Sequence, residues 1–269
     1  MRHRVRFGRL WVDALAFEDA IQSVRELVKR GSGGAIFTPN VDHVVLAEEH
    51  AGMRRAYRLA DLCFADGMPL VWTSRLLGKK IPEKLSGSDM VAPIVQLAAR
   101  ENWGVYLLGG APGEPGAAEL SAASLRADFG VRIVGVDASK VSADGSLSTD
   151  ADVVQRVRDA KPDILFVALG APKQELWIAR NLADLRPAVA IGVGASLDFI
   201  SGKISRAPRW MSNSGFEWAY RLANDPRRLW KRYLVRGPRF AVILCRTARL
   251  LRAQRVRSIA RRPVADARQ

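Results

Sequence analysis

The sequence predicts an α/β fold, a doubly wound and mainly parallel sheet with helices on both faces, followed by a basic helical C-terminal appendage. Short apolar segments alternate with segments of helical periodicity through residues 1–199. The apolar segments are hydrophobic at successive positions, which is typical of strands buried on both faces of a parallel sheet. Beyond residue 199, aromatic and basic residues interleave instead. We therefore expect two parts, residues 1–199 and residues 200–269.

Six segments have the length of buried strands and are bounded by Gly, Pro or Asp. They are Gly34–Phe37, Leu62–Ala65, Val105–Leu108, Arg132–Val136, Ile164–Leu169 and Val189–Val193. Helical periodicity fills the intervals, at Phe17–Arg30, His43–Leu59, Ser88–Glu101, Pro115–Phe129, Asp150–Ala160 and Lys173–Leu185. Ligands of such sheets bind at the carboxyl ends of the strands, so we expect a site in the loops that follow them.

The positive charge of the chain is concentrated in the appendage. Residues 200–269 hold 18 Lys and Arg against 3 Asp and Glu, whereas residues 1–199 have no net charge. Within the appendage, Arg239–Arg257 gathers its apolar residues on one helical stripe with arginines around the rest. This pattern is typical of helices that lie on anionic membranes. We expect the appendage to contact a membrane surface, and packing against the body and nucleic-acid binding are the alternatives.

Two loops after predicted strands carry polar residues that can form a site. Asn40 or Asp42 can cap the helix that follows the first of these strands, and we interpret Asp42 and His43 as part of a capped turn. Thr38 and Asn40 precede the helix proper and can point into a strand-end crevice. Asp66 directly follows an apolar strand. A half-buried carboxylate there suits a general base near neutral pH, and a helix cap is the alternative.

Two further loops are rich in glycine. Gly109, Gly110 and Gly113 lie between a strand and a helix, where backbone amides can hold a phosphate. Their spacing matches neither the dinucleotide-binding fingerprint nor the P-loop. A general nucleotide-phosphate site is therefore favoured, and a dinucleotide-dependent oxidoreductase is an alternative. Gly170 opens the other loop, in which Gln174 can bond a sugar or a uracil.

The sequence gives little support for a metal site. Its Asp-x-Asp triplet, Asp150–Asp152, follows a polar loop and opens a predicted helix, where acidic residues are expected in any case. Cys63 and Cys245 lie far apart in apolar surroundings, so we expect neither a disulfide nor a metal role. Residues 1–10 carry four arginines and no apolar stretch follows. We therefore expect no secretory signal, no membrane-spanning helix and a cytoplasmic location.

Five motifs, in order along the chain, resemble one protein family. They are Thr-Pro-Asn-Val-Asp-His (38–43), Ala-Asp-Gly-Met-Pro (65–69), Leu-Gly-Ala-Pro-Lys-Gln-Glu (169–175), the segment from Gly-Val-Gly-Ala-Ser-Leu-Asp-Phe through Ser-Gly-Lys to Arg-Ala-Pro-Arg-Trp-Met (192–211), and Phe-Glu-Trp-Ala-Tyr-Arg-Leu with Asp-Pro-Arg-Arg-Leu-Trp-Lys-Arg-Tyr (216–233). Over about residues 7–245 the chain is similar to the WecG/TagA/CpsF glycosyltransferases, also called glycosyltransferase family 26.

The resemblance implies an inverting, metal-independent hexosyltransferase without cofactors, peripheral on the inner face of the bacterial cell membrane. Such enzymes move a sugar (N-acetylmannosamine, its uronic acid or a hexose) from a UDP-sugar to an undecaprenyl-diphosphate-linked sugar in cell-surface polysaccharide synthesis. The implied partners are this donor, this polyprenyl-diphosphate-linked acceptor, an anionic membrane surface bound through residues 200–269 and further copies of the chain as a homo-oligomer, with no nucleic acid. A non-enzymatic membrane or nucleic-acid adaptor is the remaining alternative.

The resemblance also implies roles for individual residues. Asp66 matches the proposed general base, and Asp198 matches an acidic residue of the nucleotide site. Polar active-site positions match Thr38, Asn40 and Gln174. Where the family often has an arginine before a Gly-Ser-Asp stretch, this chain has Lys84, which keeps the charge without the two-pronged geometry of a guanidinium. The resemblance implies a tail that folds over the site and supplies cations for the leaving diphosphate, with the candidates Arg206, Arg209, Arg221, Arg227 and Arg228.

Overall fold

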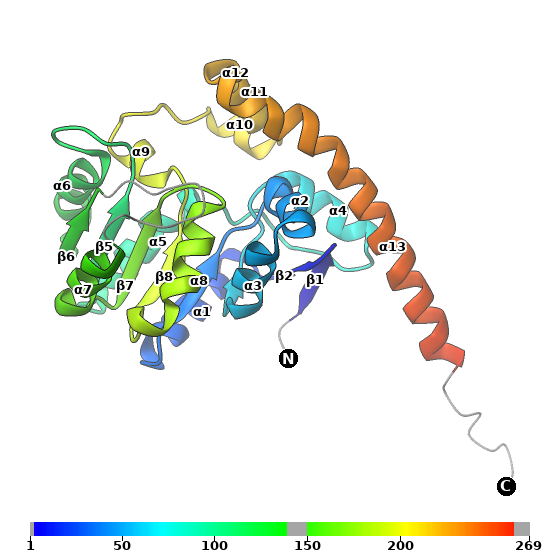
Figure 1. Cartoon of the computed structure of the whole chain (residues 1–269), viewed down its shortest axis with the longest axis horizontal. Coiled ribbons are helices and arrows are strands. Elements are labelled where there is room, and N and C mark those ends of the chain that lie inside the picture. The colour runs from blue at the N-terminus through cyan, green and yellow to red at the C-terminus, as the bar shows by residue number, and fades with distance from the viewer. Residues whose placement is uncertain (1–2, 139–149, 261–269) are drawn as a thin grey trace, which may run out of the picture.

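A six-stranded parallel sheet forms the centre of the computed structural model, which describes residues 3–138 and 150–260 (Figure 1). The strand order is β4-β3-β8-β7-β5-β6. The strands are β3 (Gly34–Phe37), β4 (Leu62–Cys63), β5 (Gly104–Gly109), β6 (Arg132–Asp137), β7 (Ile164–Ala168) and β8 (Val189–Gly192). Every neighbouring pair in this sheet is parallel. All six predicted strands are present, with small differences at their ends.

Helices cover both faces of the sheet, which confirms the doubly wound class. One face packs against α1 (Phe17–Lys29), α5 (Gly87–Arg100), α6 (Ala117–Phe129) and α9 (Ser196–Ile200). The other packs against α2 (Val41–Glu49), α3 (Ala51–Leu59), α7 (Asp150–Ala160) and α8 (Lys173–Leu185). The apolar side chains on the first of these faces form the first core, and those on the other face form the second core. Strand β3 is apolar throughout because it contributes to both: Ile36 points into the first core, whereas Ala35 and Phe37 point into the second.

The neighbouring strands β3 and β8 lead the chain to opposite faces of the sheet, since β3 is followed by α2 on one face and β8 by α9 on the other. From β3 the chain continues outward to β4, whereas β8 is reached from β7 on the other side. Ile36 of β3 pairs with Ile191 of β8. The loops that leave the two strands diverge there, and ligands of open α/β sheets bind in the resulting crevice.

Three local features differ from the sequence prediction. An antiparallel hairpin of β1 (Arg4–Phe7) and β2 (Leu10–Asp13) precedes the sheet, and a helix α4 (Met68–Leu76) follows Asp66. The buried Asp13 ties the hairpin to the sheet, because its carboxylate accepts hydrogen bonds from Arg4 Nε at 2.7 Å and from the Cys63 amide at 2.8 Å. The predicted helix His43–Leu59 is two helices, since His50 is extended and caps α3 with its ring.

The appendage is a run of helices, and the first part of its last helix packs on the body. It comprises α10 (Arg209–Asn213), α11 (Glu217–Asn224), α12 (Pro226–Trp230), a π-helical segment η1 (Lys231–Arg236) and α13 (Gly237–Ala260). Helix α13 packs on β1 and α2 (Figure 1), and Phe240 and Ile243 are buried in the second core. The ring of Phe240 lies 6.4 Å from that of Phe7, and Thr247 Oγ1 accepts a hydrogen bond from the Gly8 amide at 3.0 Å. The apolar stripe that we expected on a membrane is therefore largely covered by the body.

The described helices include none that is both long enough and apolar enough to cross a membrane.

Candidate functional site

Two neighbouring cavities lie where the appendage meets the body. The first, called here the apolar cavity, has a volume of about 330 Å³ and is lined by Met68, Pro69, Trp218, Leu234 and Phe240 among others. The second, called here the strand-end cavity, has about 420 Å³ and is formed by the loops after β3, β7 and β8, with α11 and α12 completing its wall. Four residues line both cavities: Asn40, Asp66, Arg221 and Tyr233.

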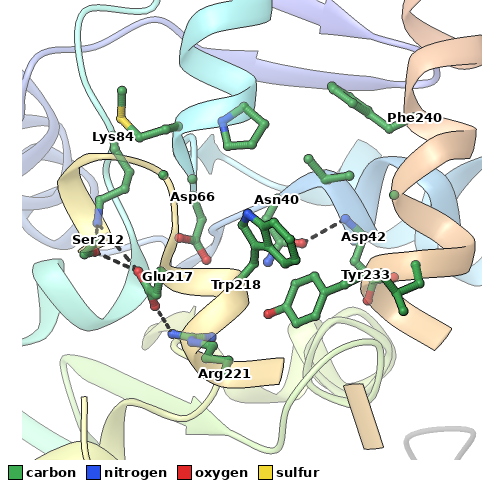
Figure 2. A pocket seen from close by; sticks show the side chains of 17 residues that line it. Asn40, Asp42, Asp66, Lys84, Ser212, Glu217, Trp218, Arg221, Tyr233 and Phe240 are labelled. Carbon is green, nitrogen blue, oxygen red and sulfur yellow. Dashed lines mark hydrogen bonds and ion pairs between the residues drawn. The ribbon is translucent and has the colours of Figure 1, made fainter. Parts of the chain in front are cut away.

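Asp66 lies at the junction of these cavities, with its carboxylate facing the side chains of the appendage (Figure 2). Its backbone amide donates to a carbonyl of the loop after β3 at 2.9 Å, which fixes its place beside that loop. Burial raises the pKa of the Asp66 carboxyl, and the Glu217 carboxylate raises it further, whereas Arg221, Lys84 and His43 oppose the rise. A carboxylate in this position can accept a proton from a hydroxyl bound in either cavity.

Thr38, Asn40 and Gln174 all line the strand-end cavity, and each also bonds within the protein. Thr38 Oγ1 donates to the last carbonyl of β8 at 3.4 Å. Asn40 Oδ1 accepts from the Asp42 amide at 3.0 Å and so caps α2, as the sequence indicated. Gln174 Oε1 accepts from the Gly194 amide at 2.9 Å, which joins α8 to the loop after β8. These bonds hold the two loops of the crevice in one arrangement.

A buried His–Glu pair supports Asn40 from behind. His43 Nδ1 lies 2.8 Å from Asn40 Oδ1, and His43 Nε2 lies 3.2 Å from Glu175 Oε1. Gln174 Nε2 donates to the same Glu175 oxygen at 2.9 Å. The side chains of His43 and Glu175 are 5% and 0% exposed. From the sequence, His43 was interpreted as part of a capped turn and Glu175 as an acid at a helix N-terminus; their contact, across 132 residues of chain, was not predicted.

Lys84 and Arg206, both predicted to bind a diphosphate, share a carboxylate. Lys84 Nζ lies 3.1 Å from Asp89 Oδ2, and Arg206 pairs with the other oxygen of Asp89. Burial alone would raise the pKa of Asp89, but a hydrogen bond from Ser86 and the contacts with Arg206 and Lys84 together lower it. The two cations are therefore balanced by an acid inside the protein, and a bound diphosphate would have to compete with Asp89 for them.

Glu217 forms a second ionic contact between the appendage and the body. It pairs with Arg221 one turn along α11, accepts a hydrogen bond from Ser212 Oγ at 2.7 Å, and lies 4.0 Å from Lys84 Nζ (Figure 2). Lys84 Nζ in turn donates to Ser212 Oγ at 2.7 Å. The sequence held one signal for Glu217, which we missed: it is one of only three acidic residues in the basic appendage.

The remaining predicted nucleotide and diphosphate residues lie in other places. Gly170 lines the strand-end cavity, but Gly109, Gly110, Gly113 and Asp198 line neither cavity. Gly109 ends β5, Gly110 and Gly113 follow it, and Asp198 Oδ1 supports this loop by accepting from the amide of residue 111 at 2.6 Å. Strand β5 is separated from β3 by two strands.

Among the predicted appendage arginines whose side chains the structure describes, Arg221 lines both cavities, whereas Arg206 and Arg227 line neither. Arg227 is exposed in the first turn of α12. The side chains of Arg209 and Arg228 lie outside the described part of the structure.

The metal-binding potential of the chain can be judged only for the residues that the structure describes. Among them, His, Cys, Asp and Glu side chains form no group of three or more that could hold an ion. Asp152 is exposed in the first turn of α7 and lines neither cavity, and the side chain of Asp150 is not described. The two cysteines form no disulfide, since Cys63 is buried and Cys245 is exposed. Burial raises the pKa of the Cys63 thiol far above its usual range.

A polar crevice at the strand ends of a parallel α/β sheet, joined to a second cavity at a buried carboxylate of raised pKa, is the usual place for the active site of an enzyme of this fold class. Residues 5–254 match the model of the Glycosyl transferase WecG/TagA/CpsF family, and the chain belongs to this family. It is therefore a glycosyltransferase of cell-surface polysaccharide synthesis. The match confirms the resemblance found in the sequence, and it displaces the oxidoreductase and adaptor alternatives. Because it extends into α13, the appendage is part of the family's common structure.

Proposed function

We propose that this protein is an inverting, metal-independent hexosyltransferase that moves a sugar from a UDP-sugar to an undecaprenyl-diphosphate-linked sugar at the inner face of the bacterial cell membrane. The observation that carries this proposal is the place of Asp66, where a polar cavity and an apolar cavity meet. Two substrates of different polarity can approach one carboxylate from two sides in such an arrangement.

The strand-end cavity suits the UDP-sugar. It lies in the crevice where open α/β sheets bind nucleotides, and its wall includes the glycine loop at Gly170 and the loop at Gly194. Glycine at these positions lets a phosphate approach the backbone, and both residues have positive φ angles that favour glycine. Thr38 and Asn40 line this cavity together with Asp66, so they can contact the sugar beside the carboxylate.

The apolar cavity suits the lipid-linked acceptor. Its wall combines apolar side chains such as Met68, Trp218 and Phe240 with polar groups at one end, near Asp66. An acceptor sugar can place its hydroxyl at that end while the first part of the lipid contacts the apolar wall.

In the proposed reaction, the acceptor hydroxyl attacks the anomeric carbon from the face opposite UDP. The new C–O bond forms as the bond from the anomeric carbon to the diphosphate breaks, and Asp66 accepts the hydroxyl proton. The leaving UDP gains negative charge, which a nearby cation stabilises. Arg221 lines both cavities and is the best placed cation for this role. Lys84 can assist once a diphosphate competes with Asp89 and Glu217 for its ammonium group.

Peripheral membrane binding follows from the charge of the appendage in this proposal. Each basic residue near an anionic surface contributes about 1 kcal/mol of attraction, so several cations of residues 200–269 together can hold the protein at the membrane where the acceptor is. Homo-oligomers of the chain are also part of the proposal, and sedimentation velocity of the full-length protein would report on them.

The test is a panel of UDP-sugars assayed for UDP release with a short polyprenyl-diphosphate-linked sugar. We expect one donor to support transfer without added metal, and NMR of the product to show inversion at the anomeric carbon. Asp66→Asn should still bind UDP but lose transfer about 100-fold or more. Asp159→Asn, which removes an exposed carboxylate of α7, is the matched control and should retain transfer. Near-normal turnover of Asp66→Asn, or retention of configuration, would refute the proposed mechanism.

A further inference from the structure

Helix α4 has an unusual outer face for a helix of the uncharged body. Its inner face is buried through Leu70, Val71 and Ser74. On the outer face, Trp72 is 47% exposed and Leu76 is 69% exposed, so Leu76 is among the most exposed large apolar residues that the structure describes. Residues 72 and 76 are four apart and therefore lie on the same side of the helix. A helix of a soluble domain normally presents polar residues on this side.

Three exposed cations are close to these two apolar side chains along the chain. Arg75 directly precedes Leu76, and Lys79 and Lys80 follow the end of the helix. Lys79 also donates a hydrogen bond to the carbonyl of Arg4 at 3.1 Å, so this lysine is anchored near the helix. A tryptophan and a leucine next to several cations are the composition of helices that lie in the interface of anionic bilayers.

The outer face of α4 is continuous with the rim of the apolar cavity. A Cβ added to Gly215 would lie only 2.5 Å from the ring of Trp72, so the ring rests directly on the turn between α10 and α11. Met68 of α4, Gly215 and Trp218 all line the apolar cavity. Phe216, next to Gly215, is 54% exposed. The body and the appendage thus jointly form an aromatic rim at the cavity that suits the lipid-linked acceptor.

We propose that α4 is a membrane contact in its own right: Trp72 and Leu76 insert into the interfacial layer of an anionic bilayer, and Arg75 and Lys80 lie among its headgroups. This inference rests on the proposed function, because it takes the lipid acceptor as the reason for a membrane at this rim. The long helix α13 cannot supply the same insertion with its main apolar stripe, since Phe240, Ile243 and Thr247 are buried against the body. The bilayer then lies at the mouth of the apolar cavity, close to Asp66.

The experiment measures binding of the full-length protein to vesicles of phosphatidylglycerol and phosphatidylethanolamine, without UDP-sugar or acceptor. We expect Leu76→Glu to weaken binding about tenfold or more, because it removes an inserted side chain and adds a repelled charge. Leu59→Glu is the matched control, since Leu59 is also the last residue of a nine-residue helix and is 42% exposed. It should bind like the unmodified protein.

A second measurement reports insertion directly. In a Cys245→Ser background, which leaves only the buried Cys63, an environment-sensitive fluorophore is attached to Leu76→Cys or to Leu59→Cys. The label at position 76 should shift to the blue on these vesicles, and the label at position 59 should not. Unchanged binding by Leu76→Glu together with an unshifted label at position 76 would overturn the inference. So would loss of self-association in Leu76→Glu with vesicle binding intact, because α4 would then be a contact between copies. Absence of transfer with every UDP-sugar would refute the proposed function while leaving the vesicle result standing.

Discussion

Docking of α13 on the body depends chiefly on the buried apolar side chains of Phe240 and Ile243, and the variant Phe240→Ala tests this. Phe240 is 7% exposed and stacks on Phe7. Truncation of a buried phenylalanine costs about 3–5 kcal/mol. The ion pairs of α13, such as Arg239 with Glu49, are largely exposed, and exposed pairs contribute only about 0–1 kcal/mol each. The apolar contact therefore dominates, and its loss should shift the docking equilibrium about 100-fold or more.

The consequence for activity follows from the cavities. The cavities are lined in part by three residues of the appendage, Trp218, Arg221 and Tyr233. These residues lie in α11 and η1, which directly precede α13, so undocking of α13 would also loosen them. We expect Phe240→Ala to lower the free energy of unfolding in urea, to make the appendage sensitive to limited proteolysis, and to reduce UDP release in the transfer assay. Val242→Ala is the control on the same helix, since Val242 is 71% exposed and its truncation should change stability by no more than about 0.5 kcal/mol. If the two variants behave alike, α13 is not docked in solution as described.

Three further predictions concern single groups. Glu217→Gln should move the acidic limb of the kcat/KM pH profile to lower pH, because Glu217 raises the pKa of Asp66 and its removal also frees Arg221; an unmoved limb would contradict this. Asp66→Asn should raise Tm at neutral pH: the folded-state pKa of this acid lies above its unfolded value, so stability falls as the pH rises through that window, and the amide removes the loss. Below the unfolded value, calorimetry should find the two proteins equal. Thr247→Val should cost about 1–3 kcal/mol in urea unfolding, because the buried amide of Gly8 loses its acceptor; a neutral effect would argue against this contact.

The regular part of the fold could be predicted because its signals are local. Buried parallel strands such as Ile164–Ala168 are apolar at every position, and this pattern has few other interpretations. The hairpin was missed although Arg4–Phe7 alternates, because its arginines conceal the apolar residues Val5 and Phe7. The stripe of α13 was recognised, but its partner was not. An apolar stripe has the same sequence whether protein or lipid covers it.

The site was predictable to the extent that strand ends define it. Thr38, Asn40 and Asp66 were proposed because they are polar residues directly after buried strands, and the structure places all three in the wall of the strand-end cavity. The contributions of the appendage could not be found in this way. Which acid faces Asp66 depends on how α11 docks across the body, and no periodicity within the sequence encodes that contact. The motif that contains Glu217 indicated the family but not the role of the residue.

The hydrogen bond between Gly8 and Thr247 joins residues that are 239 positions apart. Contacts between residues so distant along the chain require closure of a long loop before they contribute any stability. Until α13 docks, the Phe7 ring lacks the Phe240 ring that stacks on it, and the Gly8 amide lacks its acceptor. A folding intermediate with α13 undocked would therefore expose apolar surface on the hairpin, and such surface favours aggregation.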